Sequence, residues 1–172
     1  RSEETNLGDL CADAYRNVLG ADIAFVNGGG IRVAIPKGNI TYAQVIAVHP
    51  FGNMACVVEA TGQQILDALE FGARNVGKGE NGGFLQVSGL TYTINSLIEP
   101  SIQTNEAGEF VKVTGDYRVR DVKVGGVDLD LNKTYTLASH NYMLKSGGDG
   151  FVMFKGNKLL QDEVMIDNQV LI

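Results

Sequence analysis

The 172-residue chain contains no Trp, three Pro and two Cys, and it has no apolar run approaching the roughly 20 residues that a transmembrane helix needs. The scarcity of Pro excludes a proline-rich linker. The two cysteines, Cys11 and Cys56, permit one disulfide at most and lack metal-ligand spacing, and their apolar neighbours predict two small buried side chains. Fourteen basic residues stand against 20 acidic ones, with no basic block, which argues against nucleic-acid binding.

The chain is equally poor in the residues of a catalytic centre. Its two histidines, His49 and His140, lie far apart in sequence, and no His-x-Asp or His-x-x-x-His pattern occurs. Neither Ser88 nor Ser139 lies in a nucleophile elbow. We therefore expect parts of a binding site without a catalytic apparatus, and no cofactor held by this chain.

Glycine, in contrast, is abundant. The 22 glycines make up about 13% of the chain, against an average near 7%. They show no three-residue period, which excludes collagen, and a hydrophobic content of 44% excludes wholesale disorder. The glycines must therefore serve particular backbone positions.

Periodicity predicts helices mainly in the first half of the chain. An apolar stripe predicts a helix over residues 5–19 that Gly20 ends, and a buried strand follows over residues 23–26. Thr41 with Gln44 and Thr61 with Gln64 form capping-box patterns that open two more helices.

The second half of the chain reads mainly as strands. Two short strands are expected around Gly89, and Gly125-Gly126 is a two-residue hairpin signal. Residues 96–108 are expected to form a long polar connection. Helices early and strands late favour an α+β fold over a regular βαβ repeat, and without a linker or an internal repeat we expect one domain over residues 1–172.

The first candidate site is the segment Asn27-Gly28-Gly29-Gly30-Ile31-Arg32, which follows the predicted buried strand. The glycines can let the backbone approach a ligand and aim successive N–H groups at an anion, and Arg32 supplies a planar cation suited to phosphate. The alternative is a tight turn with a solvated Arg. The segment is neither a Rossmann fingerprint nor a P-loop.

Two further loops carry candidate side chains. Phe51, between Pro50 and Gly52, is either a base-stacking platform or a loop anchor packed on the domain. Asp149 lies among Gly147, Gly148 and Gly150; it can accept hydrogen bonds from vicinal hydroxyls such as those of a ribose, or it belongs to a simple Asp-Gly turn.

Together these segments belong to a series of six short blocks that follow one another along nearly the whole chain. They are 4–8 (ETNLG), 27–32 (NGGGIR), 38–42 (GNITY), 49–53 (HPFGN), 84–89 (FLQVSG) and 147–151 (GGDGF). In this order they resemble the C-terminal domain of the 5′-nucleotidase / UDP-sugar hydrolase / 2′,3′-cyclic nucleotide phosphodiesterase family. The resemblance implies a single α+β domain built as a layered α/β/β/α sandwich.

The resemblance also implies a division of labour in a longer protein. An N-terminal metallophosphatase domain of the same chain would hold two divalent metals and activate water, whereas this chain, excised from it, would bind the nucleotide or nucleoside and set specificity. Alone it would bind without catalysis. A secreted, periplasmic or cell-surface location follows by the same resemblance, with no membrane span in this segment and no nucleic-acid partner.

Carried over by position, the resemblance assigns roles to individual residues. Arg32 matches a phosphate-contacting Arg, and Asn27 matches a substrate contact at the head of the glycine loop. Phe51 matches one of two aromatics that sandwich the base, and Asp149 matches the carboxylate that holds the ribose hydroxyls. Gly28, Gly29, Gly30, Gly52 and Gly148 flank these side chains.

Two positions depart from the family pattern. Where well-known members carry a second stacking Phe, this chain has Met143, with Tyr142 beside it. Either Tyr142 takes over the stacking or Met143 makes a softer sulfur–aromatic contact. Glu3 stands where some members carry a further phosphate-binding Arg, and Arg1 is a nearby substitute.

A second hypothesis remains open at this point. The chain could instead be a stand-alone nucleotide-binding module, or a surface interaction module without a catalytic partner.

Overall fold

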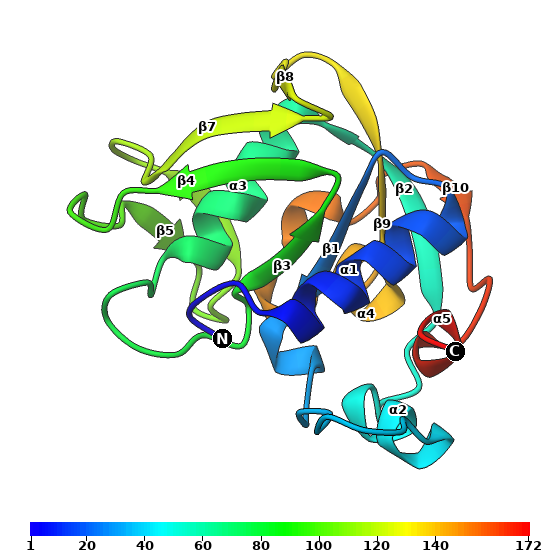
Figure 1. Cartoon of the computed structure of the whole chain (residues 1–172). Coiled ribbons are helices and arrows are strands. Elements are labelled where there is room, and N and C mark those ends of the chain that lie inside the picture. The colour runs from blue at the N-terminus through cyan, green and yellow to red at the C-terminus, as the bar shows by residue number, and fades with distance from the viewer.

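The computed structural model describes all 172 residues, and Figure 1 shows their arrangement. The helices are α1 (Asn6–Leu19), α2 (Tyr42–Val48), α3 (Gly62–Ala73), α4 (Asn141–Leu144) and α5 (Asp167–Val170), with 3₁₀ turns η1 (Gly28–Gly30), η2 (Gly148–Gly150) and η3 (Val152–Phe154). The strands are β1 (Ile23–Asn27), β2 (Ala55–Thr61), β3 (Leu85–Ser88), β4 (Leu90–Ile94), β5 (Ile102–Thr104), β6 (Phe110–Val113), β7 (Val119–Val124), β8 (Val127–Asp128), β9 (Thr134–His140) and β10 (Leu159–Gln161).

A five-stranded sheet in the order β10-β2-β9-β1-β3 forms the centre of the molecule. Strands β1 and β9 run parallel, with Ala24 opposite Ala138, and the other neighbours are antiparallel. The C-terminal ends of two parallel strands meet at one edge, so Asn27 at the end of β1 lies near His140 at the end of β9. Ligands of α/β proteins commonly bind outside such strand ends.

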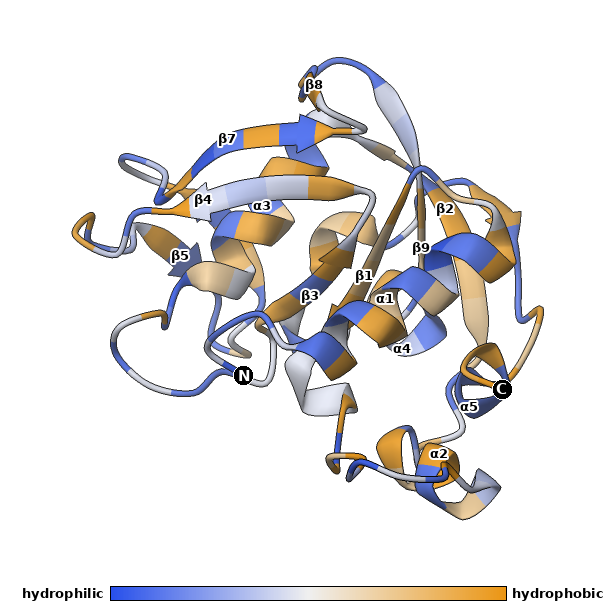
Figure 2. Cartoon of the chain, in the orientation of Figure 1, coloured by the Kyte–Doolittle hydropathy of each residue, from blue (hydrophilic) through white to orange (hydrophobic).

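Helix α1 covers one face of this sheet. Its predicted caps are confirmed, because Thr5 Oγ1 accepts the Gly8 N–H at 3.0 Å and Gly20 adopts the left-handed conformation, with φ of 67°. Figure 2 shows hydrophilic and hydrophobic residues alternating along α1, as expected for a helix with one buried face. The buried cluster on this face comprises Cys11, Ala12, Tyr15, Leu19, Ala21, Ala24, Val26, Val48, Ala55, Val57, Ala138 and Val170.

Helix α3 lies against the opposite face and also contacts β7 of a second, three-stranded sheet in the order β4-β7-β8. Figure 1 shows α3 directly behind β4 and β7. Both sides of the helix are covered, because every residue from Ala68 to Ala73 is buried. The predicted mixed class and single domain are confirmed. The layer order is a correction: α3 separates the two sheets, giving α/β/α/β where α/β/β/α was expected, since a helix buried on both sides must stand between layers.

The predicted strands around Gly89 and the hairpin at Gly125-Gly126 are also present. Short elements in the expected loops are new: β5 pairs with β6 inside the polar connection, and α4, β10 and α5 lie near the C-terminus. Both cysteines are free and buried, Cys11 beneath α1 and Cys56 on the α3 side of the sheet. No helix combines the length and the apolarity that a membrane span requires.

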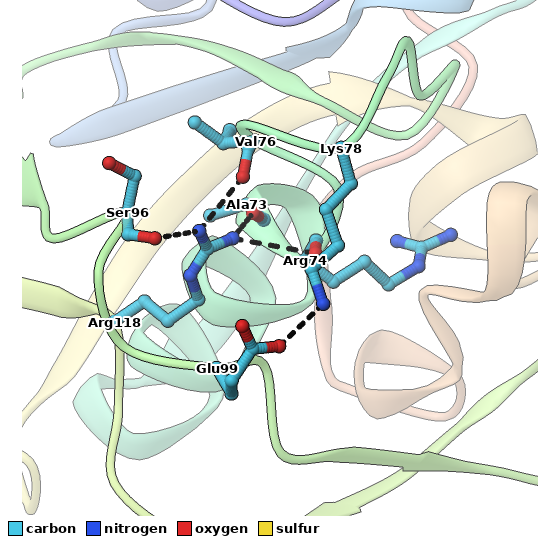
Figure 3. A network of polar contacts seen from close by, with 7 residues as sticks. All are labelled: Ala73, Arg74, Val76, Lys78, Ser96, Glu99 and Arg118. Atoms are coloured by element: carbon cyan, nitrogen blue, oxygen red, sulfur yellow. Dashed lines mark hydrogen bonds and ion pairs between the residues drawn. The ribbon is translucent and has the colours of Figure 1, made fainter.

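A buried arginine ties the end of α3 to the strands beyond it. Arg118, 1% exposed, donates to the carbonyl oxygens of Ala73 at 2.7 Å, Val76 at 2.8 Å and Ser96 at 3.2 Å, as Figure 3 shows. Its own backbone N–H donates to Glu70 Oε1 at 3.0 Å. The guanidinium therefore satisfies carbonyl groups that the helix end would leave without donors.

Candidate nucleotide-binding site

A cavity of about 420 Å³ opens at the edge where β1 and β9 end. It brings together seven residues that the sequence predicted as site residues, and three others line it as well. The predicted ones are Asn27, Gly29, Gly30, Arg32, Phe51, Tyr142 and Asp149; the others are Arg1, Asn53 and Gly82.

A larger surface groove of about 860 Å³ lies elsewhere, between the β7–β8 hairpin and the N-terminal end of β4. It contains none of the predicted site residues. Its charged side chains include the ion pair of Lys123 with Asp128. The groove is therefore not a competitor for the site predicted from the sequence.

The triple-glycine loop lies flat against a second loop, residues 82–84. The N–H of Gly28 donates to the Phe84 carbonyl at 2.7 Å, and that of Gly29 donates to the Gly82 carbonyl at 2.8 Å. A Cβ at Gly29 would stand 3.2 Å from Gly82 Cα, so the close approach requires glycine. These two N–H groups are engaged within the protein, which corrects the expectation that successive N–H groups point at an anion. The charge of this loop comes from Arg32.

Arg32 and Phe51 form one wall of the cavity. The guanidinium carbon of Arg32 lies 5.6 Å from the centre of the Phe51 ring, and its Nη1 donates to the Gly29 carbonyl at 3.1 Å. Phe51 is 59% exposed, so it is not a loop anchor buried in the domain. Gly52 follows it with φ of 71° and does not itself line the cavity.

Asp149 stands on the opposite wall and is held by two side chains. Its Oδ2 accepts the Asn27 amide at 2.6 Å, and its Oδ1 accepts the Tyr142 hydroxyl at 3.0 Å. Asp149 has φ of 55°, between Gly147 and Gly150, which also have positive φ. The carboxylate is thus fixed while both oxygens keep further lone pairs.

Helix α4 separates the two candidates for the second stacking residue. Tyr142 lines the cavity and is 41% exposed, whereas Met143 is 1% exposed and packs in the core near Ser139. Neighbouring residues of a helix point about 100° apart, so both cannot face one cavity. Met143 therefore does not reach the cavity, and Tyr142 is the residue of this pair that does.

The Tyr142 ring rests on the backbone of Gly148, where a Cβ would overlap it. Burial, with the charge of Asp149 adding to it, raises the pKa of Tyr142. The phenol consequently keeps its proton and remains a donor to the carboxylate.

Sequence reasoning missed the residues behind this wall. The buried His140 has its Nε2 at 3.0 Å from Asn27 Oδ1, and its Nδ1 accepts the Met143 N–H at 3.3 Å. Burial, followed by the effect of His49, lowers the pKa of His140 to about 4. His49 in turn contacts the Gly30 carbonyl through Nδ1 at 3.0 Å. No local motif flags either histidine, because their partners are distant in sequence.

Arg1, Asn53 and Gly82 were also absent from the predicted site. Arg1 lies beside the glycine loop and 3.9 Å from Glu80, so a second cation stands near Arg32. Asn53 ends the HPFGN block, and Gly82 belongs to a stretch predicted only as a polar loop. Block membership was the only sequence signal for Asn53.

The metals that the resemblance implies do not fit this domain. No group of three or more His, Cys, Asp or Glu side chains stands together in a way that could hold a metal ion. Both nitrogens of His140 already have protein partners.

The sequence model of the family described as 5′-nucleotidase, C-terminal domain, matches residues 1–156. The chain belongs to this family. The predicted family membership is thereby confirmed, and the residues that carried it all lie within the matched range.

Relatives of this 5′-nucleotidase C-terminal domain cover it almost completely. It is 37% identical over 181 residues to the trifunctional nucleotide phosphoesterase protein YfkN of Bacillus subtilis, which covers 99% of this chain and of which the chain covers 11%. It is 32% identical to a 5′-nucleotidase of Vibrio cholerae over 99% of this chain and 27% of that protein. The chain thus spans well under a third of these relatives.

A solved structure agrees with the fold. The crystal structure of the 5′-nucleotidase precursor of Thermus thermophilus superposes with a TM-score of 0.81 at 36% identity, covering 98% of this chain and 31% of that one. The α+β fold of the 5′-nucleotidase C-terminal domain is therefore shown both by sequence and by structure.

Proposed function

We propose that this chain is the nucleotide-binding and specificity domain of a metal-dependent phosphohydrolase that cleaves nucleotide phosphoesters. The observation that carries the proposal is the cavity in which a cation, two aromatic rings and a fixed carboxylate, from segments far apart in sequence, face one space. A nucleotide offers a complementary group for each of them.

Each side chain then has a role that its surroundings support. Phe51 and Tyr142 hold the base between apolar faces, and Asp149 accepts the two ribose hydroxyls on its free lone pairs. Arg32, with Arg1 near it, offsets the phosphate charge. The domain therefore binds, orients and neutralises its ligand.

The hydrolytic step belongs, in this proposal, to an N-terminal metallophosphatase domain of the same polypeptide. The printed names of the relatives, a nucleotide phosphoesterase and a 5′-nucleotidase, support that context. The 172-residue chain by itself would bind nucleosides and nucleotides without hydrolysing them. An extracytoplasmic location goes with the same proposal.

The test is an NMR titration of the ¹⁵N-labelled chain with adenosine, AMP and ribose 5-phosphate at millimolar concentrations. We expect shifts at Gly29, Arg32, Tyr142 and Asp149 with both nucleoside ligands, and tighter binding of AMP than of adenosine. The amides of the β7–β8 hairpin, far from the cavity, serve as the internal control. Absence of shifts around the cavity with every ligand would refute the proposal.

A further inference from the structure

His140 is a buried ionisable side chain that touches the cavity wall without lining the cavity. It is 2% exposed, at the end of β9, and stands directly behind Asn27. Neither the composition nor the motif series gave it a role. Its two ring nitrogens contact two different partners, and these partners determine which nitrogen carries the proton.

The backbone of α4 fixes the tautomer. The Met143 N–H points at His140 Nδ1 from 3.3 Å, so Nδ1 must be the bare, accepting nitrogen. A neutral imidazole with a bare Nδ1 carries its proton on Nε2. His140 therefore donates from Nε2 to the oxygen that faces it, Asn27 Oδ1, 3.0 Å away.

The same contact fixes the side-chain amide of Asn27. With Oδ1 held by His140, the amide nitrogen faces Asp149 Oδ2 at 2.6 Å and donates to it. The reverse orientation would place the amide oxygen against a carboxylate oxygen and the amide NH₂ against a proton. Gly30 leaves room for this arrangement, since a Cβ there would stand 2.7 Å from Asn27 Oδ1.

We propose that His140 is a positioning residue: its Nε2–H locks the amide of Asn27, which then holds the ribose-binding carboxylate of Asp149. This inference rests on the proposed function, because it assigns Asp149 the ligand hydroxyls. The line of donors runs from the Met143 N–H to His140, from His140 to Asn27 and from Asn27 to Asp149. Tyr142 holds the other carboxylate oxygen, so the two outer lone pairs face the cavity.

Substitution at position 140 tests the proposal. His140→Phe removes the donor, and we expect it to weaken adenosine binding roughly tenfold, the loss expected for one buried donor to a polar group. His140→Gln keeps a neutral N–H donor and a carbonyl acceptor on one side chain. We expect it to bind within about twofold of the natural protein, because both contacts of the imidazole can be reproduced.

Ribose 5-phosphate and a ligand without vicinal hydroxyls, 2′,3′-dideoxyadenosine, separate positioning from general damage. The Phe variant should lose affinity for adenosine and for ribose 5-phosphate but not for the dideoxynucleoside. Equal losses for all three ligands, or a Gln variant as weak as the Phe variant, would overturn the proposal.

A measurement on the natural chain covers the case in which His140→Phe fails to fold. Two-bond ¹H–¹⁵N correlation spectra at neutral pH should identify the Nε2–H tautomer of His140. Observation of the Nδ1–H tautomer would overturn the inference. If the natural chain binds no nucleoside, the proposed function fails; if it binds and His140→Phe binds equally well, only this inference fails.

Discussion

Two polar networks in this domain have opposite designs. Around Arg118, one guanidinium is fully buried and donates to backbone carbonyls at the end of α3 and beyond it. Around Asp149, the side chains of Asn27 and Tyr142 converge on one carboxylate, at the wall of an open cavity. The first network closes on the protein itself, whereas the second keeps acceptor capacity for something else.

The difference separates architecture from function. Backbone carbonyls give the Arg118 network no means of recognising a ligand, and its position between α3 and β7 holds the layers together. The Asp149 network rests on a strained turn and on side chains that could each have been replaced by apolar residues. A protein retains such an arrangement where a ligand uses it. The two networks should accordingly respond in different ways to substitution.

Arg118→Met should produce the largest effect, and it should fall on stability. Three or more buried carbonyls would lose their donor, and we expect a loss of about 3 kcal/mol or more in the free energy of unfolding, measured by urea denaturation. Nucleoside affinity of the remaining folded protein should not change. Lys78→Ala, which removes the exposed ion pair with Glu99 in the same region, is the control and should leave the midpoint almost unchanged.

Asp149→Asn should affect binding instead. The amide keeps the shape and tolerates the positive φ, but it loses the charge that strengthens bonds to hydroxyls, so adenosine affinity should fall by about 2–3 kcal/mol in calorimetric titration. Asp121→Asn is a matched control, since Asp121 also has positive φ, at 53°, and is exposed away from the cavity. Equal effects of the two substitutions would erase the contrast between the networks.

Phe51→Ala should weaken adenosine binding by roughly 2 kcal/mol, because removal of one stacking face costs about 1–3 kcal/mol per base. Ribose 5-phosphate, which has no base, should bind as before. Tyr42→Ala on α2, where the ring is 67% exposed, is the control. An unchanged adenosine affinity would mean that Phe51 serves only to support Arg32.

Tyr142→Phe should give the smallest effect, about 1 kcal/mol of binding free energy, since the ring stays and only the bond to Asp149 is lost. Tyr117→Phe removes a hydroxyl that bonds to Asp67 far from the cavity and should leave affinity unchanged. A loss as large as that of Asp149→Asn would show that the hydroxyl itself contacts the ligand.

Local signals in the sequence predicted the helices well. The capping boxes at Thr41 and Thr61 and the αL cap at Gly20 act within four residues, so they can be read without knowledge of the fold. The layer order could not be read in this way. Whether α3 lies outside a sheet or between two sheets depends on β7, about 50 residues later in the chain.

The site shows the same limit. Glycine neighbours and the six blocks pointed to Arg32, Phe51 and Asp149, whose roles stay predictions. The contact of His140 with Asn27 spans 113 residues, and no pattern within either segment announces it. Only the parallel pairing of β1 with β9 brings the two ends together.

The two thiols have a practical consequence. Burial raises the pKa of Cys11 and of Cys56 to about 12, and the central sheet stands between them. Each thiol is therefore protonated and screened as long as the domain is folded, and no disulfide can join the pair across the intact sheet. Alkylating reagents would label the chain only through opening events, so it carries a built-in clock for its own unfolding that needs no introduced probe.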